Sequence, residues 1–350
     1  MDIKKRILAL FLMVSVLACV FVGCSSGESN GEQTPSTEEN STETAETPES
    51  DSSESAETSE TNTDGPIAII IPSADHGWMA GTAYYAQKAV EELGLEEGAG
   101  YKLLTSANVN EQANQIDEAL SLGCAAIVLL PHNDEVTVAA NKIVAADVPL
   151  IVFDRKVPEY TAYVGGDNKG IGTVTAEYLG EKLEGQGTIA VMNTPSVGSV
   201  SSERVDGFKE VMAEKYPDIV LIDVTSAGFT QEDGLKMATD MLVANSQLDA
   251  VYSIDDEPSL GILQAIKDAG RTDIKYLTGG GGNQAYIQKI GSETDIVLST
   301  ATYSPAMIGD AVKAAHKIVS GESVEKDTVI APTIVTKENS ESYLDADSPY

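Results

Sequence analysis

The chain has 350 residues, 55 of them acidic and 22 basic, and a formal net charge of −33. A protein this acidic repels phosphate backbones, which excludes nucleic acid as an expected partner. Of its three cysteines only Cys124 lies beyond residue 24, so the sequence offers neither an internal disulfide nor a zinc or redox spacing.

The first residues have the pattern of an export signal. Three basic residues at positions 4–6 precede an almost wholly apolar run over residues 7–22. The run ends in the letters FVGC, which resemble a bacterial lipobox, so residues 1–23 are predicted to be a lipoprotein signal peptide and Cys24 the lipidated residue. Cys19 is an alternative acceptor, and an uncleaved anchor is an alternative interpretation of the run. Each possibility implies export and attachment to a membrane.

Residues 24–65 have a different composition from the rest of the chain. They are mainly Ser, Thr and Glu, and residues 25–65 contain twelve acidic side chains but no Lys or Arg. Such a segment buries too little apolar surface to offset its ordering entropy, so it is expected to be a disordered, extended tether. From Pro66 onward 19 basic and 42 acidic residues remain, a net charge of −23 for the folded part.

The first half of the folded part alternates short apolar runs with segments of helical spacing. Gly and Pro punctuate these segments, and several runs are apolar throughout, as in strands covered on both faces. The strand-like runs are residues 67–71, 103–104, 126–130 and 148–153. Helical spacing occurs over residues 83–93, 116–120 and 136–144.

The second half repeats this rhythm. Its strand-like runs are residues 188–192, 219–222, 250–254, 274–277 and 296–301. Helical spacing occurs over residues 171–178, 205–212, 235–242, 262–266 and 308–315. The alternation predicts the α/β class, with two doubly wound parallel-sheet lobes.

Polar and aromatic residues collect just after the predicted strands. In open parallel sheets ligands bind beyond the carboxyl ends of the strands, so these positions are the candidate site. Trp78, the only tryptophan, follows a polar turn after the first strand, and Asp154 with Arg155 follows the fourth. Asp255, Phe229 and Tyr303 follow strands of the second half.

Three motifs bring a family into view: PLIVFDRKV at 149–157, SSERVDGFKE at 201–210 and YSIDDEPSLGILQAIKDAG at 252–270. The chain resembles, over residues 67–335, the ribose- and galactose-type sugar-binding lipoproteins and periplasmic proteins that serve ATP-driven importers. The resemblance implies the type I periplasmic-binding-protein fold. Its lobes would be residues 66–167 plus 304–332 and residues 168–303 plus 333–345, joined by a multi-strand hinge.

The resemblance also implies a set of ligand-binding positions. They fall on Asp75, His76, Trp78, Met79, Asp154, Arg155, Ser202, Phe229, Asp255, Gly281 and Tyr303. Three of these depart from the family pattern: Ser202 replaces an arginine, although Arg204 is kept, Gly281 replaces an aspartate, and His76 replaces an asparagine. The departures leave the cleft in place but argue against ribose itself as the ligand.

The chemistry of these residues suits a polyhydroxylated ligand. Trp78, Phe229 and Tyr303 could cover the apolar C–H faces of a sugar, with Trp78 as an exposed platform. Charged groups could hold its hydroxyls through charge-assisted hydrogen bonds, each worth about 1.5–3 kcal/mol. The expected ligand is therefore a monosaccharide or related polyol, with no cofactor and no metal.

Structural alternatives exist for the same residues. Trp78 could be a lid over the edge of the core, and Asp154 with Arg155 a salt bridge within one lobe. The carboxylates at 255–257 could be helix caps, a catalytic pair or a calcium site. The glycine run at 279–282 lacks the Lys-Ser/Thr of a phosphate loop, so it is interpreted as backbone lying close to the ligand.

The function expected from these features is capture of a sugar-like solute by a monomeric, membrane-anchored binding protein that delivers it to an ABC permease. Lobe closure would occur near residues 166–168, 303–305 and 331–332. A sensory receptor of the same fold that signals to a membrane kinase is an alternative, and an extracellular glycosidase is a weaker one. The protein is not expected to be an enzyme, and residues 343–350 are expected to be a loose tail.

Overall fold

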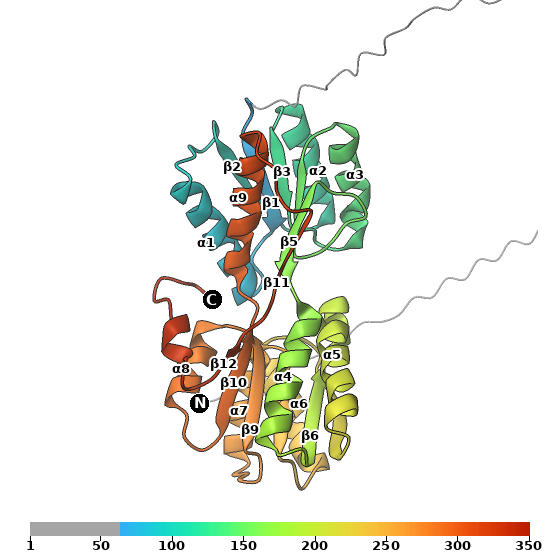
Figure 1. Ribbon diagram of the computed structural model, residues 1–350, viewed down its shortest axis with the longest axis vertical. Helices are drawn as coiled ribbons and strands as arrows, with labels where there is room; N and C mark the ends of the chain where they lie inside the picture. The colour runs from blue at the N-terminus through green and yellow to red at the C-terminus, as the bar shows by residue number, and fades with distance from the viewer. Residues whose placement is uncertain (1–63) are drawn as a thin grey trace, which may run out of the picture. The chain divides into compact units, whose positions relative to one another are not determined.

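Two six-stranded sheets, each with helices on both faces, form the fold of the computed structural model, which describes residues 64–350 (Figure 1). The described residues belong to one contact unit, Thr58–Tyr350. The predicted signal peptide, the lipidated Cys24 and nearly all of the tether lie outside them. The prediction of an α/β protein with two parallel-sheet lobes is confirmed.

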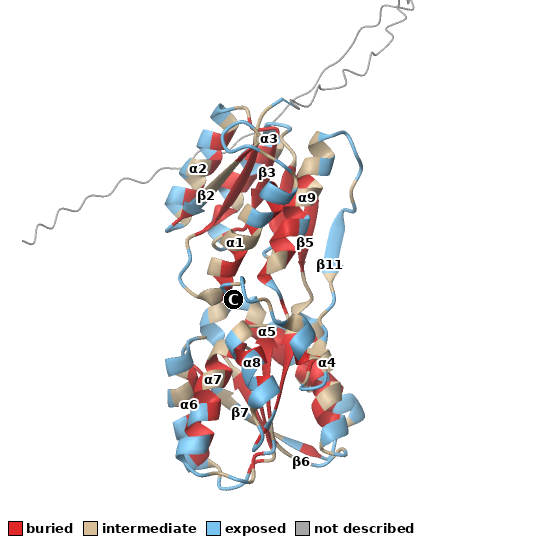
Figure 2. Cartoon of the chain, turned by 90° about the vertical axis from the view of Figure 1, so that its left-hand side faces the viewer, coloured by how far each residue is buried: buried red, intermediate tan, exposed pale blue. Residues whose placement is uncertain are grey.

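The first sheet has the strand order β11-β5-β4-β3-β1-β2, and all its strands are parallel. Its strands are β1 (Ile67–Pro72), β2 (Tyr101–Ser106), β3 (Ala126–Leu129), β4 (Leu150–Phe153), β5 (Ala162–Gly166) and β11 (Asp327–Ile330). The helices that cover it are α1 (Gly77–Glu92), α2 (Val109–Ser121), α3 (Thr137–Ala145) and α9 (Ile308–Val319). Figure 2 shows its central strands buried beneath these helices.

Alternate residues of β1 supply the two cores of this lobe. Ile69 and Ile71 pack with α1 and α9 on one face, whereas Ala68 and Ile70 pack with α2 and α3 on the other. Because successive side chains of a strand point to opposite faces, a continuous apolar run is what a strand buried on both sides requires.

The second sheet has the order β12-β10-β9-β8-β6-β7 and is parallel except for the β10–β12 pair. Its strands are β6 (Gly187–Asn193), β7 (Ile219–Thr225), β8 (Ala250–Tyr252), β9 (Tyr276–Gly281), β10 (Val297–Thr302) and β12 (Ile334–Val335). The helices of this lobe are α4 (Asn168–Lys182), α5 (Ser199–Lys215), α6 (Gln231–Ala244), α7 (Asp256–Asp268) and α8 (Gln284–Ser292). Short 3₁₀ helices are η1 (Asp134–Val136), η2 (Pro195–Val197), η3 (Pro305–Met307) and η4 (Ser340–Tyr343).

Side-chain caps fix where the helices nearest the strand ends begin. Asp167 accepts a hydrogen bond from the Gly170 amide at α4, and Asn283 accepts from the amides of the first turn of α8. Thr230 and Asp233 form a reciprocal capping box at α6. Caps of this kind satisfy amides that lack a partner within the helix, and each contributes about 1 kcal/mol.

The chain passes between the two sheets three times. It leaves the first sheet after β5 and enters α4, returns after β10 through η3 to α9 and β11, and crosses again between β11 and β12. Helix α9 therefore packs against strands that lie far before it in sequence (Figure 1).

Five features differ from the sequence expectation: three strands, the glycine run and the C-terminal segment. Strands β5, β11 and β12 were not predicted, and β11 is almost fully exposed, so it lacks the apolar signal of the other strands (Figure 2). Residues 279–281 belong to β9 rather than to a following loop, because they pair in register with residues 300–302 of β10. Residues 343–350 are also not a loose tail, since Tyr350 is buried.

Candidate functional site

A cavity of about 350 Å³ lies where strands of both sheets end. Its lining residues are Asp75, His76, Trp78, Met79, Asp154, Arg155, Ser196, Val197, Val200, Arg204, Phe229, Thr230, Asp255, Gly281, Tyr303 and Tyr350. Ten of the eleven residues proposed from the sequence are therefore brought together. Other hollows, such as one of about 500 Å³ between α6, α7 and α8, lack this combination of rings and charges.

Trp78 lies in the first turn of α1 and forms part of the wall from the first lobe. Its indole Nε1 donates a hydrogen bond of 2.9 Å to the Tyr303 carbonyl oxygen. Its ring stacks on Phe153, with centroids 5.9 Å apart, and lies 6.0 Å from the Tyr303 ring. Trp78 is only 9 % exposed, so it is a packed wall residue and not the exposed platform that was expected.

Asp154 follows β4 in a left-handed backbone conformation, with φ of 64°. Its Oδ1 accepts a hydrogen bond of 2.5 Å from the Tyr303 hydroxyl. Burial raises the pKa of Asp154, although the Tyr303 hydrogen bond and the charges of Arg155 and Arg204 act in the opposite direction. Backbone strain in a non-glycine residue is uncommon and often occurs where a side chain must be aimed.

Arg155 is exposed and does not pair with Asp154. Its guanidinium donates to the backbone carbonyl of His132, and none of the ion pairs within residues 64–350 joins Arg155 to Asp154. The His132 ring is in turn bonded to the Ser106 hydroxyl at 3.0 Å. The alternative of an Asp154–Arg155 salt bridge is therefore not what the structure contains.

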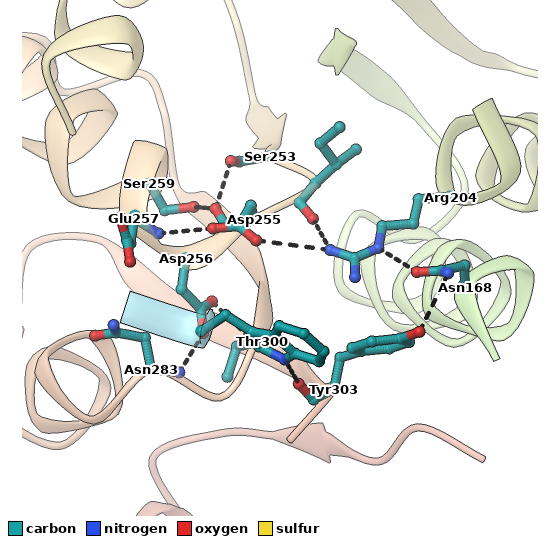
Figure 3. Close-up of polar contacts among 12 residues, drawn as sticks. Asn168, Arg204, Ser253, Asp255, Asp256, Glu257, Ser259, Asn283, Thr300 and Tyr303 are labelled. Atoms are coloured by element: carbon teal, nitrogen blue, oxygen red, sulfur yellow. Dashed lines mark hydrogen bonds and ion pairs between the residues drawn. The ribbon is translucent and has the colours of Figure 1, made fainter. Parts of the chain in front are cut away.

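Arg204 is the central cation of the wall from the second lobe. It is 3 % exposed, and Figure 3 shows it between Asn168 and Asp255. Its Nε donates to Asn168 Oδ1 at 2.9 Å, and an NH1 hydrogen goes to the Ile254 carbonyl at 2.7 Å. NH1 lies 3.8 Å from Asp255 Oδ2, and the guanidinium lies 5.0 Å from the centre of the Tyr303 ring. The cation thus fixes both an acid and a ring of the cavity.

Asp255 and Asp256 have different roles at the start of α7. Asp255 is the N-cap, accepting from the Glu257 amide at 3.1 Å, and its carboxylate faces the cavity. Asp256 is fully buried and accepts from the amides of Gly282 and Asn283 and from the Thr300 hydroxyl. Burial raises the pKa of Asp255 well above its ordinary value and that of Asp256 to about 6.

Asp256 holds the end of the glycine run in place through the Gly282 amide, and Figure 3 shows its neighbouring contacts with Asn283 and Thr300. Gly281 and Gly282 both have positive φ, 137° and 100°, which a residue with a side chain rarely adopts. Their conformation directs the Gly282 amide to Asp256, while the Gly281 carbonyl accepts from the Tyr303 amide at 2.7 Å. The run therefore brings bare backbone to the cavity.

Ser202 is the proposed residue that does not line the cavity. It is exposed on α5, and its hydroxyl donates to the Ser199 carbonyl of the same helix. In a helix of 3.6 residues per turn, positions 201, 204 and 208 share a face, and these three side chains are buried. Arg204, the arginine of the motif that is kept, is therefore the one that lines the cavity.

The remaining first-lobe residues that line the cavity are Asp75, His76 and Met79. Asp75 and His76 pair with each other through the imidazole Nδ1. The amide of the next residue, Gly77, donates across to Glu257 Oε1 at 3.1 Å, so a direct hydrogen bond joins α1 to α7. Phe229 lines the cavity from the loop before α6 and is half-buried.

The set of binding positions proposed from the sequence leaves out six lining residues: Ser196, Val197, Val200, Arg204, Thr230 and Tyr350. Ser196 follows β6, and Arg204 belongs to a recognised motif, so signals for these two existed. Tyr350 follows no strand and has no periodic neighbours, which left its position without a signal.

Membrane-spanning helices and metal-binding clusters are both absent from the part of the chain that the structure describes. None of its helices is long and apolar enough to span a bilayer. Residues 64–350 also contain no group of three or more His, Cys, Asp or Glu side chains arranged to hold a metal ion.

A ring-walled, charge-lined cavity at the strand ends of two α/β lobes defines a two-lobed ligand-binding protein. Residues 67–323 match the family described as "Periplasmic binding protein domain", which is most of the chain, and the protein belongs to that family.

The curated relatives include the D-apiose import binding protein of Actinobacillus succinogenes, which is 31% identical over 60% of this chain and 68% of its own length. The xylitol-binding protein of Mycolicibacterium smegmatis is 28% identical over 67% of this chain and 68% of its own. Among solved structures, an ABC transporter periplasmic solute binding protein from Actinobacillus succinogenes with bound D-allose has a TM-score of 0.71. The match covers 80% of this chain and 100% of the chain in that structure. At 20% sequence identity it supports the fold alone.

Proposed function

We propose that this protein is an extracytoplasmic, lipid-anchored receptor that captures a sugar or sugar-like polyol in the cavity and delivers it to an ABC importer. The observation that carries the proposal is the composition of the cavity. Rings of Trp78 and Tyr303 and charged groups of Asp154, Arg204 and Asp255 line the same 350 Å³ space. A sugar presents apolar C–H faces to rings and a rim of hydroxyls to charges.

The relatives support the same ligand class. Two of them are named for D-apiose and xylitol, a sugar and a sugar alcohol. The volume lies within the range of about 300–1,000 Å³ that is usual for small-molecule sites. Cooperating polar groups would discriminate between isomers, because a missing ligand hydroxyl leaves a buried charge unpaired.

Release and capture would use the three chain crossings. Closure of two lobes around a ligand requires rotation at only a few backbone positions. Residues 166–168, 303–305 and 331–332 lie where the chain passes from one sheet to the other. We propose them as the hinge between lobes 66–167 plus 304–332 and 168–303 plus 333–345.

Ligand binding is tested by calorimetry and thermal unfolding with D-apiose, xylitol, D-allose, ribose and myo-inositol. A ligand at about 100 times its Kd should stabilise the folded protein by about 2.7 kcal/mol and raise Tm. Because Trp78 is the only tryptophan and lines the cavity, its fluorescence should change in parallel. If no sugar or polyol changes either signal, the proposal is wrong, and steady turnover of a glycoside would replace it with an enzyme.

The anchor is tested separately. In the full-length chain, Cys24→Ser should move the protein from the membrane fraction to the soluble extracytoplasmic fraction. Cys19→Ser is the matched control and should leave it on the membrane. The reverse result would assign the lipid to Cys19, and release by neither change would contradict lipidation.

A further inference from the structure

The C-terminal segment, residues 343–350, is attached to both lobes. Gln284 of α8 donates to the Tyr343 carbonyl at 3.0 Å and accepts from the Asp345 amide at 2.9 Å. On the other lobe, the Tyr85 hydroxyl of α1 donates to Asp345 Oδ2 at 3.4 Å. Ser348 then closes a turn by bonding both the amide and the carbonyl of Tyr350. These contacts direct the segment toward the cavity.

Tyr350 is buried where the two lobes meet. It is 4 % exposed and belongs to the apolar cluster of the first lobe that includes Trp78 and Tyr303. The end of the chain is marked there in Figures 1 and 2. A Cβ atom added to Gly81 would lie 3.0 Å from the Tyr350 Cβ, and one added to Gly77 would lie 3.1 Å from the ring. The absence of side chains on one face of α1 makes room for this ring.

The Tyr350 hydroxyl reaches the second lobe. A Cβ added to Gly281 would lie 2.1 Å from Tyr350 Oη, so the phenol occupies the space that a side chain at position 281 would need. Tyr350 lines the cavity, yet no hydrogen bond of its hydroxyl is found among residues 64–350. A buried phenol that opens on a cavity without a protein partner is a donor available to a ligand.

The surroundings keep this hydroxyl protonated. Burial raises the pKa of Tyr350 well above its ordinary value, and the charges of Asp255 and Asp256 raise it further. A neutral phenol can donate one hydrogen bond and accept another, which matches the dual character of a sugar hydroxyl.

We infer that Tyr350 is a ligand-contacting, specificity-determining residue of the cavity, delivered by the C-terminal segment and occupying the space beside Gly281. The inference rests on the proposed function and deepens it, because it assigns a ligand hydroxyl to a residue outside both sheets. Tyr350 is a wall and not a plug, since the cavity keeps its 350 Å³ with the ring in place.

The test compares full-length Tyr350→Phe, Tyr350→Ala and Tyr343→Phe with the parent protein on D-apiose, xylitol, D-allose, ribose and myo-inositol. Tyr343→Phe removes the same hydroxyl from the same segment but at a residue that does not line the cavity. Circular dichroism and Tm without ligand confirm that each variant is folded.

Loss of one hydrogen bond predicts that Tyr350→Phe weakens binding of the best ligand roughly three- to tenfold. The loss should be smaller for ligands that lack the hydroxyl concerned, so the rank order of the panel changes. Tyr350→Ala should weaken the best ligand further, and Tyr343→Phe should match the parent.

Other outcomes overturn the inference. A parent-like ligand profile for Tyr350→Phe and Tyr350→Ala would remove Tyr350 from the site while leaving the proposed function intact. Tighter binding by Tyr350→Ala to every ligand would identify the ring as a competitor for the cavity. Absence of binding by the parent itself would defeat the proposed function, and the inference with it.

Discussion

The two walls of the cavity differ in how their polar groups are satisfied. On the second-lobe side, the buried Asp256 behind the wall accepts three hydrogen bonds from the protein, and Arg204 of the wall is bonded to Asn168 and the Ile254 carbonyl. On the first-lobe wall, Asp154 receives a single side-chain donor among the described residues, Tyr303. The second-lobe wall is thus a preorganised frame, whereas the first-lobe wall keeps hydrogen-bonding capacity for a ligand.

This contrast predicts that substitutions in the frame mainly lower stability, whereas substitutions in the first-lobe wall mainly lower ligand affinity.

The largest expected effect is the loss of stability on substitution of Asp256. Asp256→Ala leaves two amides and one hydroxyl without a partner and should lower the free energy of unfolding by about 3 kcal/mol. Urea denaturation measures the loss. Asp256→Asn, which can still accept from the amides, is the matched control and should lose much less.

The next largest effect is on affinity. Asp154→Asn should weaken ligand binding roughly 10- to 100-fold, because a charge-assisted hydrogen bond is worth about 1.5–3 kcal/mol. Asn tolerates the left-handed backbone of this residue, so Tm without ligand should change little. Calorimetry measures the Kd, and unchanged affinity would show that the wall has been misassigned.

The free energy of unfolding should depend on pH through Asp256, which belongs to the second-lobe frame. Burial raises the pKa of Asp256 from 3.8 to about 6, so the folded protein binds this proton more readily than the unfolded chain. The contribution to stability therefore grows as pH falls from 6 to about 4 and is lost as pH rises through 6. Urea denaturation between pH 7 and 4.5 should show the parent gaining about 1–3 kcal/mol relative to Asp256→Asn. A relative loss on acidification would contradict the assignment.

The smallest effect is expected at Phe229. This residue is an exception to the division between a second-lobe frame and a first-lobe binding wall, because it lies on the second lobe but is only half-buried. Phe229→Leu should weaken ligand binding by about 0.5–1.5 kcal/mol and leave Tm unchanged. Phe208→Leu is its control: Phe208 is fully buried and stacked on Tyr252 at 4.0 Å, so its loss should lower Tm without a direct contact to ligand.

Residues that trail the apolar strands could be placed from the sequence. Parallel topology carries the ends of β1, β4, β8 and β10 to one edge of each sheet, so Trp78, Asp154, Asp255 and Tyr303 meet there. What strand order alone does not determine is which side of a helix faces the cavity. One residue of helical rotation, about 100°, separates the exposed Ser202 from a buried position.

Other parts of the site carry no local signal. Asp256 and Asp255 are adjacent carboxylates with the same chemistry, and only the burial of Asp256 against residues 282–283 and Thr300 distinguishes them. Tyr350 reaches the cavity through an irregular segment whose path depends on contacts with Gln284 and Tyr85. Strand β11 is an exposed edge and therefore lacks the apolar pattern that revealed its neighbours.

The discontinuous first lobe has a consequence for biosynthesis. Ile308, Val312 and Ala315 of α9 cover the face of the first sheet that carries Val128 and Ile151, yet they follow every strand of the second sheet except β12 in sequence. A nascent chain that ends before residue 308 exposes this apolar face, so the first lobe completes its core only after most of the second lobe has been translated. Contacts of such long sequence separation slow folding. Aggregation would therefore begin while the first lobe is incompletely folded and its apolar face is exposed.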